Sequence, residues 1–285
     1  KNSKFQFVNG DYTDANLINN LKSNIDHVIF LGGLVGDPVT NKYPELAKKI
    51  NDTGIINCIN LLERKKIKNF IFISTCSNYG LIKDEEKADE SFKLQPLSLY
   101  AKSKVKIEKF LLDKKNKVNF NVTILRFATA FGLSPRMRFD LTVNEFTKEL
   151  MLNNDLKIYD PDTWRPYCHV MDFSRIIYSV VTTKISTKYF EVFNVGGDEN
   201  NYTKRQIANK LITYFPQSKI IYKKKEGPDK RNYKVDFSKV RKNLNFKPKY
   251  NLNYGIEEII DFLKTKNLDY FIRNRKKFGN YEINN

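Results

Sequence analysis

The sequence contains no long hydrophobic run. Its most apolar stretch, HVIFLGGLVG at residues 27–36, carries three glycines. It is about half as long as a membrane span, which takes about 18 to 20 apolar residues. These residues therefore include no candidate for a transmembrane helix.

Cysteine is also scarce. The three cysteines, Cys58, Cys76 and Cys168, are far apart. An odd number of widely spaced cysteines argues against a disulfide framework, and none of them has metal-ligand spacing. We therefore expect no metal site. Reduced thiols are typical of the cytosol, so we predict a cytoplasmic protein.

Acidic residues are few relative to basic ones. The chain has 32 Asp and Glu against 50 Lys and Arg, a formal net charge of +18. The lysines are spread along the chain, without one dense basic arm and without the stacking motif of an RNA-binding domain. We therefore expect no nucleic-acid partner. A positive field would instead help an anionic substrate to approach.

Short β-rich runs alternate with helical patterns in the first half of the chain. This rhythm predicts βαβ units, hence a doubly wound parallel sheet with helices on both faces. After residue 132 the rhythm changes and predicts a smaller C-terminal α/β lobe. The predicted strands are 4–11, 27–33, 69–74, 121–127, 156–160 and 191–196; the predicted helices are 43–66, 98–115, 138–152, 203–215 and 254–265.

Small or polar residues follow the predicted strands. Asp11, the pair Gly32 and Gly33, the run Ser74 to Ser77, and Thr129 each stand where a strand ends. Ligands of open parallel sheets bind beyond the carboxyl ends of the strands, so we expect these residues at the rim of a ligand site.

Tyr100 and Lys104 stand four apart in the segment LYAKSK and project from one face of a predicted helix. A tyrosine is a poor base at neutral pH, but a nearby ammonium favours its phenolate. The pair can therefore serve as a general base.

The ordered motifs of the chain resemble those of the extended short-chain dehydrogenase/reductases, the nucleotide-sugar epimerase/dehydratase family. Tyr100 follows Thr75 by 25 residues, as in that family. Further segments similar to family motifs are LRFATAFG (125–132), RPYCHVMD (165–172), FNVGG (193–197) and GPDKRNYKVDFSKV (227–240). The resemblance implies a Rossmann-type fold over nearly the whole chain. It implies an NAD-binding domain at 1–132 with a return at about 166–197, and a substrate-binding lobe at 133–165 and 198–285.

The resemblance also implies roles for single residues. Tyr100 would take a proton from a sugar hydroxyl as hydride passes to NAD, Lys104 would hold the nicotinamide ribose and lower the pKa of Tyr100, and Thr75 would bond the reacting oxygen. The expected cofactor contacts are Asp11, Tyr12, Leu31, Gly32, Gly33, Asn51, Ser74, Tyr100, Lys104 and Phe127. The expected substrate contacts are Thr75, Cys76, Ser77, Thr129, Arg136, Arg138, Arg165 and Arg231. His169 and His27 are expected to be structural.

The chain departs from the family pattern in three places, one of which is Thr129, where many members have an Asn that contacts the substrate. It has no GxxGxxG phosphate loop. We therefore expect roughly 50 to 60 further residues, about two βα units, upstream of Lys1. The two residues after Thr75 are Cys76 and Ser77, where sugar 4,6-dehydratases of the family carry Asp and Glu. Elimination of water needs such an acid and base, so dehydration is disfavoured.

The segment GLSPRMRFDLTVNEF (132–146) resembles a subset of the family that includes a GDP-heptose 4-dehydrogenase. In this segment Arg136 and Arg138 could bind substrate, or could form a loop salt bridge to Asp140 or Glu145.

The resulting hypothesis is NAD-dependent oxidation at C4 of a nucleotide-activated sugar, in surface-polysaccharide biosynthesis, by a 4-epimerase or a 4-dehydrogenase. The alternatives are a 4-keto reductase or dehydratase of the same family, and a non-catalytic NAD(P)-binding regulatory protein. The resemblance implies a homodimer through the helices at 43–66 and 100–114.

Overall fold

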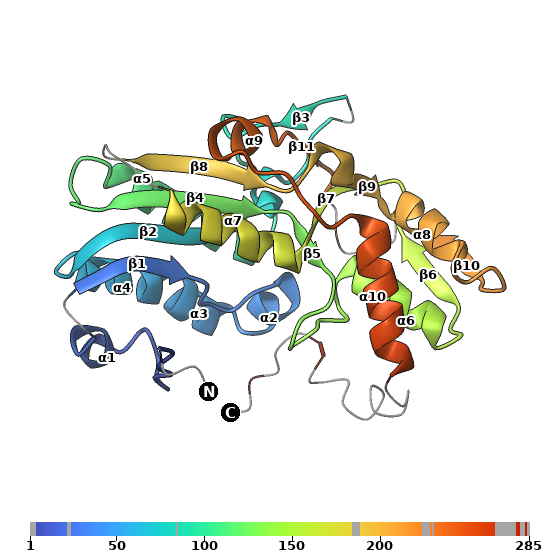
Figure 1. The fold of residues 1–285 in the computed structure, drawn as a ribbon, viewed down its shortest axis with the longest axis horizontal. Helices are drawn as coiled ribbons and strands as arrows, with labels where there is room; N and C mark the ends of the chain where they lie inside the picture. The colour runs from blue at the N-terminus through green and yellow to red at the C-terminus, as the bar shows by residue number, and fades with distance from the viewer. Residues whose placement is uncertain are drawn as a thin grey trace.

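A four-stranded parallel sheet forms the centre of the larger part of the molecule (Figure 1). The computed structural model describes residues 4–21, 24–83, 85–183, 189–223, 229, 231–265, 278, 279 and 283. The strands of the sheet, in spatial order, are β1 (Asn24–Phe30), β2 (Lys66–Thr75), β4 (Asn121–Phe127) and β8 (Phe190–Val195). The predicted parallel sheet is confirmed, and β8 returns to it from the second half of the chain.

Both faces of this sheet are covered. Successive residues of a strand point to opposite faces. Phe70 of β2 therefore packs in one apolar cluster with α4 (Ile55–Leu62) and α5 (Leu99–Asp113), whereas its neighbour Ile71 packs in another with α7 (Val170–Thr182). This burial explains why the strands read as continuous apolar runs.

The segment between β1 and β2 is divided into several short helices. They are α2 (Asp37–Lys42), α3 (Pro44–Ala47), a π-helix (Lys48–Gly54) and α4. The single helix predicted at 43–66 is thus three consecutive helical pieces, and Lys66 already begins β2. π-helical turns are rare and frequently mark functional sites.

The second lobe has its own apolar core. Helices α6 (Thr142–Met151), α8 (Lys204–Ile212) and α10 (Leu252–Lys264) pack there, next to β6 (Leu156–Tyr159), which pairs with β10 (Ile220–Lys223). A three-stranded sheet of β5 (Thr129–Phe131), β7 (Trp164–His169) and β9 (Asn201–Thr203) lies between the large sheet and these helices (Figure 1). The helices predicted at 138–152, 203–215 and 254–265 are confirmed.

Residues 233–246 lie against the large sheet. This segment includes β11 (Lys234–Val235), which pairs with β3 (Lys87–Ala88), and α9 (Ser238–Leu244). Val235 and Val240 belong to the same apolar cluster as Leu125 of β4. The domain boundaries remain a prediction, but this segment packs with the first domain rather than with the second lobe. The remaining short helices are α1 (Ala15–Asn19) and two 3-10 turns, Cys76–Tyr79 and Asp198–Asn200.

The strand predicted at residues 4–11 is wrong. Residues 5–9 are irregular, and Phe5, Phe7 and Val8 are 74%, 77% and 50% exposed. A strand persists only where a neighbouring strand pairs with its backbone. Among the described residues, β1 is an edge strand that pairs with β2, and the segment at 5–9 has no strand beside it. None of the described helices combines the length and apolar composition needed to cross a bilayer.

Candidate active site

A cavity of about 580 Å³ lies at the carboxyl ends of β2 and β4. The arrowheads of the large sheet point toward the second lobe in Figure 1, so the cavity is bounded by both parts. Its lining comes from the loop after β1, the ends of β2 and β4, α5, α7 and the segment at 138–141, together with Arg231. The predicted rim of small and polar residues therefore does line one cavity at Ser74, Thr75, Ser77 and Thr129.

One side of this cavity, called here the reactive wall, consists of Thr75, Tyr100 and Lys104. Tyr100 and Lys104 lie one helical turn apart on α5, and Ser98 begins that helix by accepting a hydrogen bond from Ala101 N at 3.2 Å. Thr75 is the last residue of β2. The end of β2 thus positions Thr75, and the capped helix α5 positions Tyr100 and Lys104.

The Lys104 ammonium is deeply placed. Its Nζ donates to the carbonyl oxygen of Ile73 at 2.7 Å and lies 4.7 Å from the ring centroid of Phe72 and 5.8 Å from that of Tyr100. Burial lowers the pKa of Lys104 to about 8, against a smaller opposing effect of Glu108. The charged form of Lys104 is therefore less favoured than that of a lysine in water.

The phenol of Tyr100 is shielded from water. Burial, followed by the negative charge of Asp37, raises the pKa of Tyr100 to about 12, while Arg138 and Arg231 lower it. The predicted lowering by Lys104 remains a prediction. In the structure the positive charges of Arg138 and Arg231 favour the phenolate.

Thr75 has a hydroxyl hydrogen to offer. Its Oγ1 accepts a hydrogen bond from Ser77 N at 3.1 Å and so begins the 3-10 turn. Among the described residues it donates to no acceptor, which leaves its O–H to bond an oxygen in the cavity.

A buried polar network supports the reactive wall from behind. Arg126 of β4 forms an ion pair with Glu108 of α5, Nη2 to Oε2 at 2.6 Å, and Asn78 Nδ2 donates to Glu108 Oε1 at 2.8 Å. The hydroxyl of Ser74, expected to contact the cofactor, also donates to this carboxylate. Burial opposes the charge of Arg126, but Glu108 outweighs it and raises the pKa of Arg126. No sequence motif indicated Glu108, although it follows Lys104 by one further helical turn.

Asn51 acts on the loop after β1 rather than in the cavity. From the π-helix, its Oδ1 accepts from Leu34 N at 2.8 Å and its Nδ2 donates to Leu34 O at 2.9 Å. Gly33 beside it has φ 129°, and a Cβ there would lie 2.8 Å from Asn51 Oδ1. The amide thus fixes a turn that needs glycine.

The other predicted cofactor contacts lie around this loop. A Cβ on Gly32 would lie 2.9 Å from the ring of Tyr12, whose hydroxyl donates to Ile50 O at 3.1 Å. Leu31 lines the cavity, as does Phe127, whereas Asp11 is exposed and accepts from Thr13 N at 2.8 Å.

A second group of lining residues, called here the charged wall, consists of Asp37, Arg138, Asp140 and Arg231. Arg138 is held by Asp140, Nε to Oδ1 at 2.9 Å, and this ion pair is the loop salt bridge considered from the sequence. Arg136 does not line the cavity, and its Nη2 donates to Gly279 O at 3.2 Å. We therefore leave Arg136 out of the proposed substrate contacts.

Asp229 organises the two arginines that the sequence assigned to the diphosphate. It pairs with Arg231 Nε at 2.7 Å and with Arg165 Nη2 at 3.0 Å. Burial alone would raise the pKa of Asp229, but the hydrogen bonds and charges of these arginines lower it. Arg231 also donates to Ser77 Oγ at 2.9 Å and reaches the cavity, whereas Arg165 is buried behind it.

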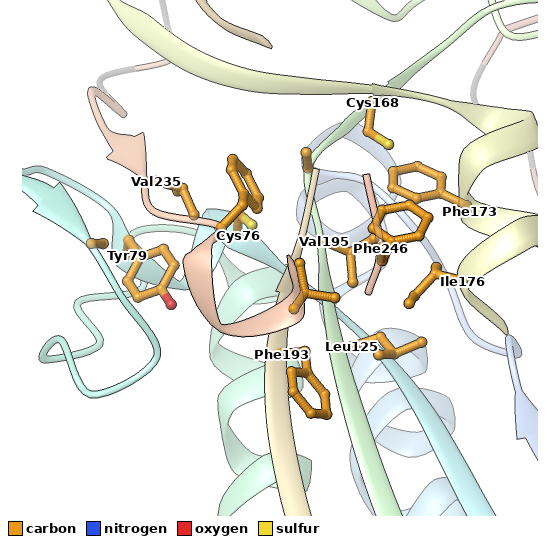
Figure 2. Close-up of a cluster of buried hydrophobic side chains, with 14 of the residues drawn as sticks. Cys76, Tyr79, Leu125, Cys168, Phe173, Ile176, Phe193, Val195, Val235 and Phe246 are labelled. Atoms are coloured by element: carbon orange, nitrogen blue, oxygen red, sulfur yellow. The ribbon is translucent and has the colours of Figure 1, made fainter. Parts of the chain in front are cut away.

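Cys76 does not reach the cavity. It is fully buried, and its thiol lies 3.2 Å from the carbonyl oxygen of Arg126. Figure 2 shows its side chain among apolar groups that include Val235. Burial raises the pKa of the Cys76 thiol. Because a strand end turns successive residues to opposite sides, Thr75 faces the cavity and Cys76 the core, so we remove Cys76 from the predicted substrate contacts.

Both histidines have structural partners. His169 accepts from Met171 N through Nδ1 at 3.2 Å, which begins α7, and its Nε2 lies 2.5 Å from Glu258 Oε1. His27 Nδ1 lies 2.9 Å from Asn69 Nδ2. Neither residue lines the cavity.

Known proteins resemble this chain over most of its length. The family model for the NAD dependent epimerase/dehydratase family matches residues 1–196. A UDP-glucuronate 4-epimerase of Thermodesulfobacterium geofontis is 24% identical over 93% of this chain and 81% of its own length. A dTDP-glucose 4,6-dehydratase of Actinoplanes sp. is 26% identical over 90% of this chain and 79% of its own length.

A solved structure has the same architecture. The UDP-glucuronic acid 4-epimerase of Bacillus cereus, in complex with UDP-glucuronic acid and NAD, matches with a TM-score of 0.80 at 24% identity. The match covers 93% of this chain and 83% of that one. It shows a shared fold, and the predicted fold class is confirmed.

Proposed function

The chain belongs to the NAD dependent epimerase/dehydratase family, and from this membership we propose that it oxidises C4 of a nucleotide-activated sugar with NAD. The observation that carries the proposal is the single cavity shared by Thr75, Tyr100 and Lys104. The relatives named above act on UDP-glucuronate and dTDP-glucose, which supports a nucleotide-diphosphate sugar as the substrate.

The described residues fit the nicotinamide end of NAD. Ile73, Phe127 and Phe173 give the cavity an apolar side next to Lys104, and the rings of Phe127 and Phe173 stack with centroids 3.8 Å apart. The two glycines after β1 do not line the cavity, because Tyr12 and Asn51 occupy the space beside them. When bound, NAD would accept a hydride from the sugar. Lys104, at the floor of this pocket, is the residue we assign to the ribose hydroxyls.

Thr75 and Tyr100 handle the sugar hydroxyl in this proposal. Thr75 donates its O–H to the reacting oxygen, and Tyr100 takes the proton of that hydroxyl as the C4–H bond breaks. The high pKa of Tyr100 makes it a strong base once ionised. Arg138, Arg231 and the positive charge of oxidised NAD would all favour the phenolate.

The outcome after oxidation is either 4-epimerisation or release of the ketone. Both use the same three residues, so product analysis must decide between a 4-epimerase and a 4-dehydrogenase. Dehydration is disfavoured because neither residue after Thr75 is an acid. Cys76 is buried, and Ser77 accepts a hydrogen bond from Arg231. A role in surface-polysaccharide synthesis and a cytoplasmic location remain predictions.

We also propose a homodimer through α3, α4 and α5. Lys106 of α5 pairs with Asp52 at 3.0 Å, and Lys114 donates to Asn60 Oδ1 at 2.9 Å, so these helices present one joined surface. Sedimentation of the full-length protein tests the proposal, and a monomer at micromolar concentration would contradict it.

Tyr100→Phe in the full-length protein tests the catalytic assignment. We expect hydride transfer to fall by about 10² to 10⁴-fold, because the proton acceptor is lost, while NAD binding survives. Reduced NAD is followed at 340 nm in a single turnover, and products are separated by chromatography.

Tyr178→Phe on α7 is the matched control, since this tyrosine is 70% exposed outside the cavity. If Tyr100→Phe transfers hydride as fast as the control, the mechanism is wrong. If the wild-type protein binds NAD but turns over no nucleotide sugar, the regulatory alternative is favoured.

A further inference from the structure

The cavity also contains the carboxylate of Asp37, a residue that no sequence motif indicated. Asp37 is the first residue of α2 and follows Gly36, whose φ of 107° makes the turn that α2 requires. Helix α2 packs against α5, the helix that carries Tyr100. Asp37 is thus a residue of the charged wall that lines the same cavity as Tyr100.

The protein satisfies only part of the Asp37 carboxylate. Oδ2 lies 3.2 Å from Arg231 Nη2, whereas Oδ1 is buried and has no hydrogen-bond partner among the described residues. A buried, unpaired carboxylate oxygen is costly, so an oxygen left in this state indicates a missing donor. Each oxygen of an ionised carboxylate can accept more than one hydrogen bond, so Oδ2 can accept one from a ligand while it pairs with Arg231.

The arginines of the charged wall are already neutralised. Arg138 is held by Asp140 through two hydrogen bonds at 2.9 and 2.5 Å. Arg231 is held by Asp229 through two more, at 2.7 and 2.8 Å, and because Asp229 also pairs with Arg165, Asp37 balances the remaining positive charge. Among the described lining residues, the remaining cation is Lys104, which donates a hydrogen bond to Ile73 O. The side of the cavity around Asp37 therefore offers a carboxylate without a surplus positive charge.

We propose that the Asp37 carboxylate accepts a hydrogen bond from a hydroxyl of the sugar, and that it makes the site select neutral sugars over uronic acids. The proposal rests on the proposed function and names its substrate class. A hydroxyl can donate to Asp37, whereas a uronate carboxylate can only accept and carries the same charge. Asp37 also acts electrostatically on Tyr100, which places its charge near the reacting group.

The test compares sugars that differ only at C6. The full-length protein with NAD is given UDP-glucose or UDP-glucuronic acid, and GDP-mannose or GDP-mannuronic acid. For the nucleotide it accepts, we expect the wild type to favour the neutral sugar by at least about 100-fold in kcat/KM, the size expected for two like charges about 5 Å apart in a site of intermediate dielectric.

Two variants separate the charge of Asp37 from its role as an acceptor. Asp37→Asn keeps an oxygen acceptor but removes the charge, so the preference for the neutral sugar falls about 10- to 100-fold, mainly through a lower KM for the uronate. Asp37→Ala removes both, so kcat/KM for the neutral sugar also falls about tenfold or more. Asp26→Asn is the matched control, because Asp26 is exposed on β1 and pairs with Lys68. Thermal unfolding confirms that all three variants fold.

The outcomes distinguish this proposal from the proposed function. Hydride transfer with equal preference for both sugars of a pair contradicts the role of Asp37 alone. An unchanged preference in a folded Asp37→Asn variant contradicts it as well. Failure to transfer hydride from any nucleotide sugar contradicts the proposed function. In that case, binding of the same four sugars to the protein still measures the preference.

Discussion

The reactive wall and the charged wall of the cavity are held in different ways. Thr75, Tyr100 and Lys104 lie on β2 and α5, whose backbones are fixed by the sheet and by helical hydrogen bonds. Arg138 and Arg231 lie in irregular segments and are held by carboxylates through ion pairs. Backbone hydrogen bonds thus fix the position of the reactive wall, whereas ion pairs hold the arginines of the charged wall.

This difference fits the tasks that we assign to each wall. Proton and hydride transfer require atoms placed within fractions of an ångström, which rigid elements provide. Recognition of one sugar among many requires charges that can differ between related proteins, and loops tolerate such changes. The comparison can be tested by changing the support of each wall in turn.

Glu108→Gln removes the support behind the reactive wall and has the largest expected effect. It leaves the Arg126 guanidinium buried without its counter-ion, so the free energy of unfolding falls by about 3–5 kcal/mol. Urea unfolding measures the loss. Glu63→Gln is the control. Glu63 pairs with Lys114 near the surface, so the loss of this ion pair lowers the free energy of unfolding by at most about 1 kcal/mol. Equal losses in the two variants would show that the network does not hold the wall.

Lys104→Met tests the burial of the ammonium through pH. The pKa of Lys104 is about 8 in the folded protein and 10.5 in its ordinary state. Between these values the unfolded chain binds a proton that the folded one does not, so the stability due to Lys104 rises with pH. We expect the free energy of unfolding of the wild type, minus that of the variant, to increase by about 3 kcal/mol from pH 7.5 to 10.5. Lys102→Met, on the exposed face of α5, should show no comparable rise.

At neutral pH the same variant should be more stable than the wild type but inactive, because the cost of burying the ammonium is removed together with its function. If the difference in the free energy of unfolding between wild type and variant does not change with pH, the ammonium of Lys104 is well solvated.

Arg138→Gln weakens the charged wall and leaves the three residues of the reactive wall in place. We expect KM for the nucleotide sugar to rise about tenfold, because a recognition contact is lost. We expect a smaller fall in kcat, because Arg138 is also one of the charges that lower the pKa of Tyr100. Arg136→Gln separates the two arginines predicted from the sequence. Arg136 donates a hydrogen bond to Gly279 O outside the cavity, so the KM of the Arg136→Gln variant should stay within about twofold of the wild-type value. A larger effect of Arg136 than of Arg138 would overturn this assignment.

Cys76→Ala has the smallest expected effect on the reaction. The side chain lies in the apolar cluster of Figure 2, so its truncation costs about 1 kcal/mol of stability. Hydride transfer should remain within about twofold of the wild type. Cys58→Ala, another buried cysteine away from the cavity, is the control. If Cys76→Ala loses hydride transfer and Cys58→Ala does not, Cys76 belongs to the active site after all.

Much of the reactive wall could be predicted from the sequence because its information is local. The interval of four between Tyr100 and Lys104 sets their shared face through helix geometry alone. Gly33 could be predicted to follow the end of a strand, but the amide of Asn51 that fixes its turn could not be predicted. That contact depends on a π-helix, which no periodic pattern indicated.

The charged wall could not be predicted in the same way. Arg138 could bind substrate or Asp140, and the sequence left both possibilities open. Asp37 stands far along the chain from both Tyr100 and Arg231, and only the packing of α2 against α5 brings it to them. The strand expected at 4–11 failed for a related reason, since strand formation depends on a partner that local sequence does not supply.

By itself, then, the sequence determined the parallel α/β sheet, the face shared by Tyr100 and Lys104, and the absence of an acid pair after Thr75. These follow from residue identity and from the repeat of a helix or strand. The tertiary structure alone decided that Cys76 is buried, that Arg138 is paired, and that Asp37 shares a cavity with Tyr100. Such outcomes depend on which distant segments meet at the ends of the strands, and long-range packing fixes that.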